Sequence, residues 1–180
     1  SGGKKMSKSL GNVIAPFKLV KQWSTDAVRY YLLREIPSFD DGDYSDQRMK
    51  EVYNADLADE LGNLLSRLTT LGEKDNLVIN NEFEPKTVYP PRYRTFINLF
   101  RFNQALQHIW IEIKGLNKHI NDSAPWDKSK EERQNFLIKS LKRLHDIGYY
   151  LSTFLPDTSE KIISQTQGKI LKANSLFPKK

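Results

Sequence analysis

The residues best suited to chemistry lie near the amino end, in the run Lys5-Met6-Ser7-Lys8-Ser9. Two lysines three positions apart, with the hydroxyls of Ser7 and Ser9 beside them, can wrap a triphosphate. Their ammonium groups would offset the charge that builds on a leaving pyrophosphate. The surrounding glycines favour a loop that closes over its ligand. On these grounds alone, a solvated basic segment is the stronger interpretation.

Two short helices are predicted to follow this loop, which covers residues 1–15. Pro16 suits the first turn of a helix that ends at about residue 23, and the polar residues 24–26 offer caps for a second helix that ends at about residue 34. The residues from Pro37 to Tyr44 form a turn and a boundary. The sequence therefore predicts a first unit at 1–45, made of the basic loop and a small connecting segment.

Residues 46–180 are predicted to form a helical domain. From the cap residue Ser45, leucines recur at three- and four-residue steps as far as Leu71, which indicates a long amphipathic helix. A loop at 73–90, with a short extended piece at 77–79, separates it from another long helix. We expect that helix to begin at Pro91, to bury Phe96, Leu99 and Phe100, and to end at about residue 120.

The last part of the chain carries two capping-box spacings. Ser129 with Glu132 predicts the start of one helix, and Asp157 with Glu160 predicts the start of another. Trp23 and Trp110 lie in apolar phase and are expected in the core. The fold class is therefore mainly α, an antiparallel helix bundle behind a basic loop.

The composition narrows the classes of function. The net charge of +6 favours a polyanionic partner, although many basic proteins bind no nucleic acid. The lack of cysteine excludes disulfides and thiolate sites, and three scattered histidines argue against a metal site. No apolar run approaches the roughly 20 residues of a membrane span. We expect a cytoplasmic protein with no membrane partner.

The run at residues 5–9 is identical to KMSKS, the second ATP-site motif of class I aminoacyl-tRNA synthetases. The residues that follow, Asn12 to Phe17, Asp26 to Glu35 and Asp41 to Ser45, resemble the methionyl-tRNA synthetase family in particular. This resemblance implies that Lys5 and Lys8 are catalytic and that both, with Ser7 and Ser9, bind ATP.

A second group of residues could contact RNA. Asn63 and Arg67 are four positions apart and share one helix face, so an amide and a guanidinium could meet an unstacked base and its phosphate. An ordinary polar face is the simpler interpretation of this spacing. Trp126 follows a proline in an interhelical loop, where it could stack on a base or plug the end of the bundle. The resemblance implies that Asn63, Arg67, Asn117 and Trp126 read the anticodon.

The resemblance further implies what the whole protein does. It would ligate methionine to tRNA(Met) with ATP and Mg²⁺, while ATP and methionine bind through a catalytic domain outside this fragment. The fragment alone is expected to hold no cofactor and to be inactive, and a homodimer is an option only for the whole protein. Two alternatives remain: a fragment of another class I synthetase, or an RNA-binding helical module without catalysis.

Overall fold

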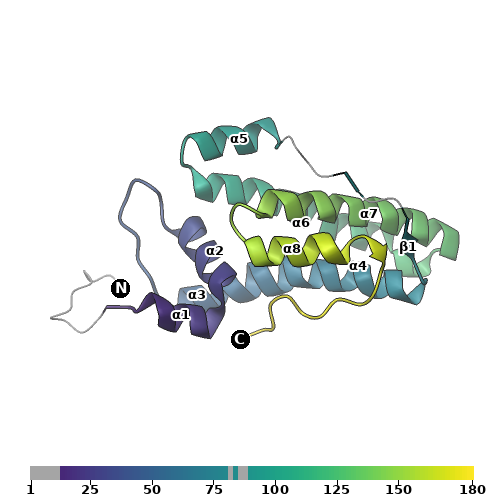
Figure 1. Ribbon diagram of the computed structural model, residues 1–180, viewed down its shortest axis with the longest axis horizontal. Coiled ribbons are helices and arrows are strands. Elements are labelled where there is room, and N and C mark those ends of the chain that lie inside the picture. Colours follow the sequence, from purple (N-terminus) through teal and green to yellow (C-terminus); the bar gives the residue numbers. More distant parts are fainter. Residues whose placement is uncertain (1–12, 81–82, 85–88) are drawn as a thin grey trace.

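The structure is a computed structural model that describes residues 13–80, 83–84 and 89–180, and the helices of this part form an elongated bundle (Figure 1). Two short helices come first, α1 at Pro16–Trp23 and α2 at Thr25–Glu35. Pro16 occupies the first turn of α1, and the hydroxyl of Ser24 caps α2 by accepting from the amide of Ala27 at 3.4 Å. Both helices were predicted from their caps, and both are confirmed.

The predicted long helix from Ser45 is a continuous rod of three segments. These are α3 at Asp46–Val52, the π-helical segment η2 at Tyr53–Gly62, and α4 at Asn63–Lys74. The hydroxyl of Ser45 accepts from the amide of Arg48 at 3.1 Å, as expected of a cap. The π-helical turns were not predicted, because a leucine repeat of three and four residues describes an ordinary α-helix.

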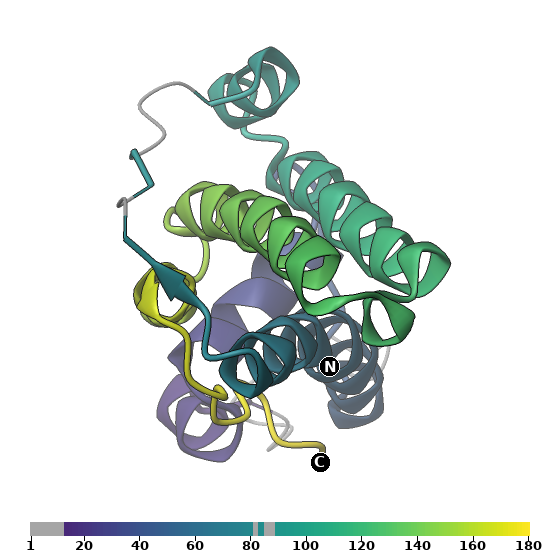
Figure 2. The ribbon, with the colours of Figure 1, turned by 90° about the vertical axis from the view of Figure 1, so that its right-hand side faces the viewer.

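The prediction of one helix from Pro91 to residue 120 is wrong. The chain forms α5 at Pro91–Asn98 and α6 at Phe102–Ser123, with a sharp reversal between them. Phe100 has a φ of 55°, a left-handed backbone conformation that a right-handed helix cannot contain. The amide of Arg101 donates to the carbonyl of Phe96 at 2.8 Å. Leu99 and Phe100, expected inside, are 49% and 57% exposed. Figure 2 shows α5 above α6 at the outside of the bundle, and its residue Tyr93 is buried in the core.

The carboxyl part of the chain packs back along the bundle. The single-turn helix η3 covers Pro125–Asp127, α7 covers Lys130–Leu151, and α8 covers Pro156–Gln165. The capping box of Ser129 and Glu132 is confirmed at the start of α7. The second predicted box is wrong, because Pro156 takes the first helical position of α8 and leaves Asp157 inside its first turn. At that position the negative charge of Asp157 still interacts favourably with the helix dipole.

A short antiparallel pair joins two distant parts of the chain. Strand β1 is Val78–Ile79, close to the predicted extended piece, and pairs with β2 at Gly168–Lys169. In Figure 2 the arrow of β1 lies beside the yellow helix α8.

The buried apolar residues form one cluster that includes side chains of α1, α2, the rod, α6, α7 and α8. Trp23 and Trp110 are 5% and 6% exposed, which confirms their expected place in the core. The helical bundle is therefore confirmed, whereas the boundary at residue 45 stays a prediction. Among the described helices, none has both the length and the hydropathy that a membrane span requires.

Candidate nucleic-acid interface

The predicted ATP-binding residues Lys5, Ser7, Lys8 and Ser9 lie outside the described residues. Their roles stay predictions. The second predicted group of residues lies where the rod and α6 run side by side.

Two polar pairs join the rod to α6. The side-chain amide of Asn117 donates to both the carbonyl oxygen and the carboxylate of Glu60, each at 3.0 Å. One turn further along α6, the amide oxygen of Asn121 accepts from the guanidinium of Arg67 at 2.6 Å. The residue numbers of the two pairs rise together on both elements, so α6 runs in the same direction as the rod. Asn117 and Arg67 are thus brought to one seam, although the sequence separates them by 50 positions.

Arg67 is half-buried. Within the described part of the chain it forms no ion pair, and its hydrogen bond goes to the neutral amide of Asn121. Asn63 lies one turn earlier on the same face of α4, exposed, with only a 3.4 Å contact to Asp59. A guanidinium held by a neutral group retains its attraction for a phosphate or for a base carbonyl.

Trp126 lies in η3, just beyond the end of α6. Pro125 is buried and holds this turn in place, whereas the indole of Trp126 is 47% exposed. Ala124, with a φ of 40°, ends α6 and turns the chain toward α7. The plug interpretation expects a covered indole, and the exposure found here leaves an open ring surface for stacking.

The sequence did not indicate which residues support this turn. The ring of His119 on α6 packs at 5.1 Å between centroids on Phe136 of α7, and the ammonium of Lys128 lies 6.0 Å from the same ring. These contacts join the helices that flank η3. The amphipathic phase of α7 was the only available signal for Phe136, and it does not identify a partner.

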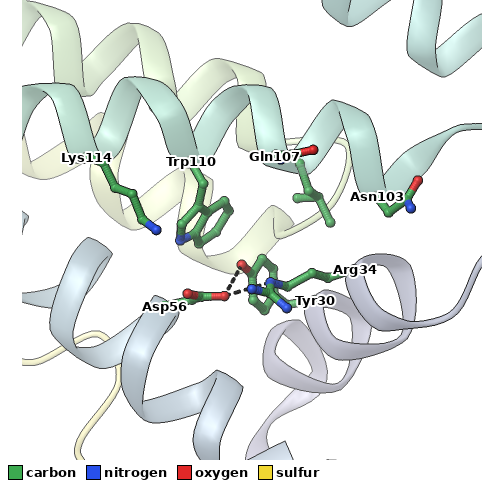
Figure 3. Close-up of a pocket in the computed structure, with 8 residues that line it drawn as sticks. Tyr30, Arg34, Asp56, Asn103, Gln107, Trp110 and Lys114 are labelled. Atoms are coloured by element: carbon green, nitrogen blue, oxygen red, sulfur yellow. Dashed lines mark hydrogen bonds and ion pairs between the residues drawn. The ribbon is translucent and has the colours of Figure 1, made fainter. Parts of the chain in front are cut away.

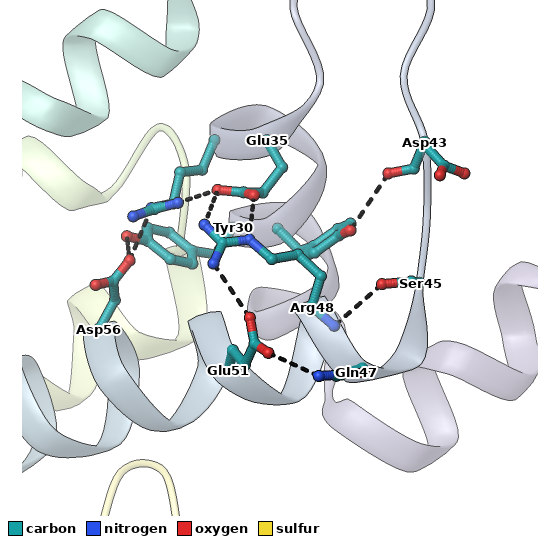
Figure 4. A network of polar contacts seen from close by, with 10 residues as sticks. Tyr30, Glu35, Asp43, Ser45, Gln47, Arg48, Glu51 and Asp56 are labelled. Carbon is teal, nitrogen blue, oxygen red and sulfur yellow. Dashed lines mark hydrogen bonds and ion pairs between the residues drawn. The ribbon is translucent and has the colours of Figure 1, made fainter. Parts of the chain in front are cut away.

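The structure also reveals a buried polar network between α2 and the rod (Figure 4). Asp56 is 7% exposed, and its Oδ2 accepts from the hydroxyl of Tyr30 at 2.8 Å and pairs with Nε of Arg34 at 2.7 Å. Burial, reinforced by the charge of Asp56, raises the pKa of Tyr30 well above its ordinary value. The phenol therefore stays protonated and acts as a donor. No pattern in the sequence indicated this network.

Glu35 extends the network toward the surface. Burial alone would raise its pKa, but the hydrogen bonds from Arg48 and the charge of Arg34 lower it. Arg48 holds this carboxylate at 2.7 Å and reaches Glu51 at 3.3 Å. Every arginine of this network thus faces a carboxylate, which makes it a structural joint between α2 and the rod.

A cavity of about 270 Å³ opens beside Asp56, between α2, η2 and α6 (Figure 3). Its lining includes Trp110 and Lys114, on the same side of α6 as Asn117. Among the described residues, no group of three or more histidines, aspartates and glutamates is arranged to hold a metal ion.

Comparisons with known proteins agree with this architecture. Residues 1–69 match the family model described as tRNA synthetases class I (M). The chain is 37% identical to the methionine–tRNA ligase of Clostridium acetobutylicum, over 91% of this chain and 28% of that protein. It is also 37% identical to the methionine–tRNA ligase of a Nostoc species, over 91% of this chain and 34% of the relative. The chain thus spans about a third or less of these relatives.

Solved structures give the same result for the fold. Mycobacterium tuberculosis methionyl-tRNA synthetase in complex with methionyl-adenylate superimposes with a TM-score of 0.83 and 25% identity, over 98% of this chain and 42% of that one. A second structure of that protein bound by methionyl-adenylate gives 0.82 and 27% identity, over 97% and 42%.

Proposed function

The chain belongs to the methionyl-tRNA synthetase family, and we propose that it supplies two parts of a methionine–tRNA ligase: the ATP-closing loop and the surface that reads the anticodon. The whole protein would activate methionine with ATP and Mg²⁺ and transfer it to tRNA(Met) in the cytoplasm. Lys5 and Lys8, with Ser7 and Ser9, would stabilise the charge that develops on pyrophosphate.

For the anticodon half, the proposal rests on one observation. Arg67 carries a charge that no described carboxylate neutralises, at the same end of the bundle as the half-exposed indole of Trp126. A splayed base could stack on the indole, while Arg67 and Asn63 bond its edge and the adjoining phosphate. Asn117 would join α6 to the rod through its hydrogen bond to Glu60, and it would contact the base by giving up that hydrogen bond. The CAU anticodon is the proposed ligand.

Binding of the 180-residue chain to RNA stem-loops tests this half. We expect a CAU stem-loop to bind more tightly than a loop with a substituted anticodon, and binding to weaken between about 50 and 200 mM salt. Trp126→Ala should weaken binding by about 1–3 kcal/mol, the usual value of a base–aromatic stack. Phe39→Ala is the matched control, because Phe39 is an 80% exposed aromatic residue in the loop between α2 and α3. Equal losses in both variants would contradict the proposal.

Pyrophosphate exchange by the whole enzyme tests the catalytic half. Lys8→Ala should lower the exchange rate about a hundredfold, as loss of one transition-state donor does, with methionine binding unchanged. Lys4→Ala is the control, since Lys4 immediately precedes the motif. A full rate in Lys8→Ala would exclude the catalytic assignment.

A further inference from the structure

The cavity beside Asp56 contains a donor without an acceptor. Trp110 is 6% exposed, and its indole Nε1–H has no hydrogen-bond partner among the described residues. An unsatisfied buried donor is costly, so a ligand atom that accepts from it would gain that energy. The ammonium of Lys114, one turn further along α6, is exposed and forms no ion pair with any described residue. Figure 3 shows both nitrogens facing the same space above Asp56.

The same space has an acceptor. Tyr30 and Arg34 both bond to Oδ2 of Asp56, which leaves Oδ1 of this cavity-lining carboxylate with its acceptor capacity. A phosphate group would be repelled by this oxygen, and a hydrocarbon would leave both donors and the acceptor unsatisfied. The lining therefore suits a ligand with an N–H donor next to an oxygen or ring-nitrogen acceptor.

Unpaired cytosine, adenine and guanine have that pattern on their Watson–Crick edges. The exocyclic amino group would donate to Asp56, and the adjacent acceptor would take the hydrogens of Trp110 and Lys114. Guanine would instead place its carbonyl at the two donors. Uracil would donate its ring N3–H to Asp56 and place a neighbouring carbonyl at the two donors. The volume of about 270 Å³ gives a single base room.

The cavity shares a helix face with the proposed anticodon surface. Trp110, Lys114, Asn117 and Asn121 recur at steps of four, three and four along α6, so they form one stripe. The eleven residue steps from Trp110 to Asn121 span about 16 Å at the rise of an α-helix. A single RNA loop that reaches Arg67 could thus extend toward the cavity.

We propose that this cavity binds an unpaired nucleobase, either one from the bound RNA or that of a free nucleotide. The RNA source rests on the proposed anticodon function. The free-nucleotide source stands without it.

Indole ¹⁵N–¹H spectra of the chain separate these cases, because the protein has three tryptophans. Trp110→Phe assigns one signal, and Trp126→Phe assigns another. Trp23, buried in the core, is the internal control. The probes are a CAU stem-loop RNA, and CMP, AMP and UMP.

We expect the Trp110 signal to move with the RNA or with CMP, AMP and UMP. Movement with RNA alone would identify the RNA as the source, and movement with the mononucleotides would show that free nucleotide suffices. A Trp110 signal that stays fixed with every probe would overturn the inference. In that case, a Trp126 signal that moves with the RNA would still support the anticodon proposal, and a fixed Trp126 signal would contradict it.

A variant pair gives a second test that leaves the core intact. Lys114→Ala should weaken binding of the probe that moves the Trp110 signal about tenfold, the value of a hydrogen bond to a charged group. Lys139→Ala removes an exposed lysine of α7 and should leave the affinity unchanged. Identical affinities in the two variants would overturn the inference.

Discussion

Arg133 and Arg67 both belong to the end of the bundle where α4 and α6 finish and α7 begins, yet they contact different partners. Arg133 grips both carboxylate oxygens of Asp75, at 2.8 and 2.6 Å, and this carboxylate is only 3% exposed. Arg67 meets the neutral amide of Asn121. The first contact neutralises a charge inside the fold, and the second keeps a charge available for a ligand.

The comparison predicts its largest effect at the buried pair. Arg133→Ala would remove the guanidinium that bonds both carboxylate oxygens of Asp75, so the free energy of unfolding should fall by more than in the other variants of this comparison. Urea denaturation measures this, with Lys139→Ala expected within about 0.5 kcal/mol of the parent. If Arg133→Ala is as stable as the control, Arg133 does not hold the fold.

Low pH should weaken the ion pair between Arg133 and Asp75. The hydrogen bonds from Arg133 lower the pKa of Asp75 below its ordinary value of 3.8. A group with a lowered pKa in the folded state stabilises the fold above its unfolded pKa and loses that contribution as the pH falls through the folded pKa. We expect stability to drop below about pH 4 and Asp75→Asn to flatten this drop. Parallel pH profiles of parent and variant would remove Asp75 from the explanation.

Tyr30→Phe should have a smaller effect on the joint between α2 and the rod. The substitution removes one bond to the charged Asp56 and keeps the pairing with Arg34, so a loss of about 1.5 kcal/mol is expected. Thermal unfolding monitored by circular dichroism measures it. A change as large as that of Arg133→Ala would mean that Arg34 alone cannot hold Asp56.

Arg67→Ala should have the smallest effect on stability. Its one described partner is an exposed amide, which water can satisfy, so the free energy of unfolding should change by less than about 0.5 kcal/mol. Urea denaturation again measures it. A loss of several kcal/mol would make Arg67 a structural residue like Arg133 and would erase the contrast.

The sequence predicted the features that depend on neighbouring residues. Ser45 and Ser129 begin helices as their types and spacings indicated, and the leucine repeat identified the rod. The reversal at Phe100 was missed, because no glycine or proline marks it. The hydroxyl of Ser38, 62 positions away, bonds to the Phe100 carbonyl, a contact that local patterns do not encode.

The same distinction holds for the candidate site, where local spacing could be predicted and contacts between distant residues could not. The four-residue spacing of Asn63 and Arg67 correctly placed both on one helix face. The contacts of Asn117 with Glu60 and of Asp56 with Tyr30 cross 57 and 26 positions, and no local pattern reports them. The burial of Asp56 depends on the packing of α2 against the rod, which the sequence alone does not show.

The most direct test is the affinity of Arg67→Ala for a CAU stem-loop, measured over a range of salt concentrations beside Lys139→Ala. If Arg67 is a charge held for RNA, its loss should weaken binding about tenfold or more and reduce the salt slope by about one, while Lys139→Ala and the folding stability stay at the parent values. An unchanged affinity and slope in Arg67→Ala would contradict the account.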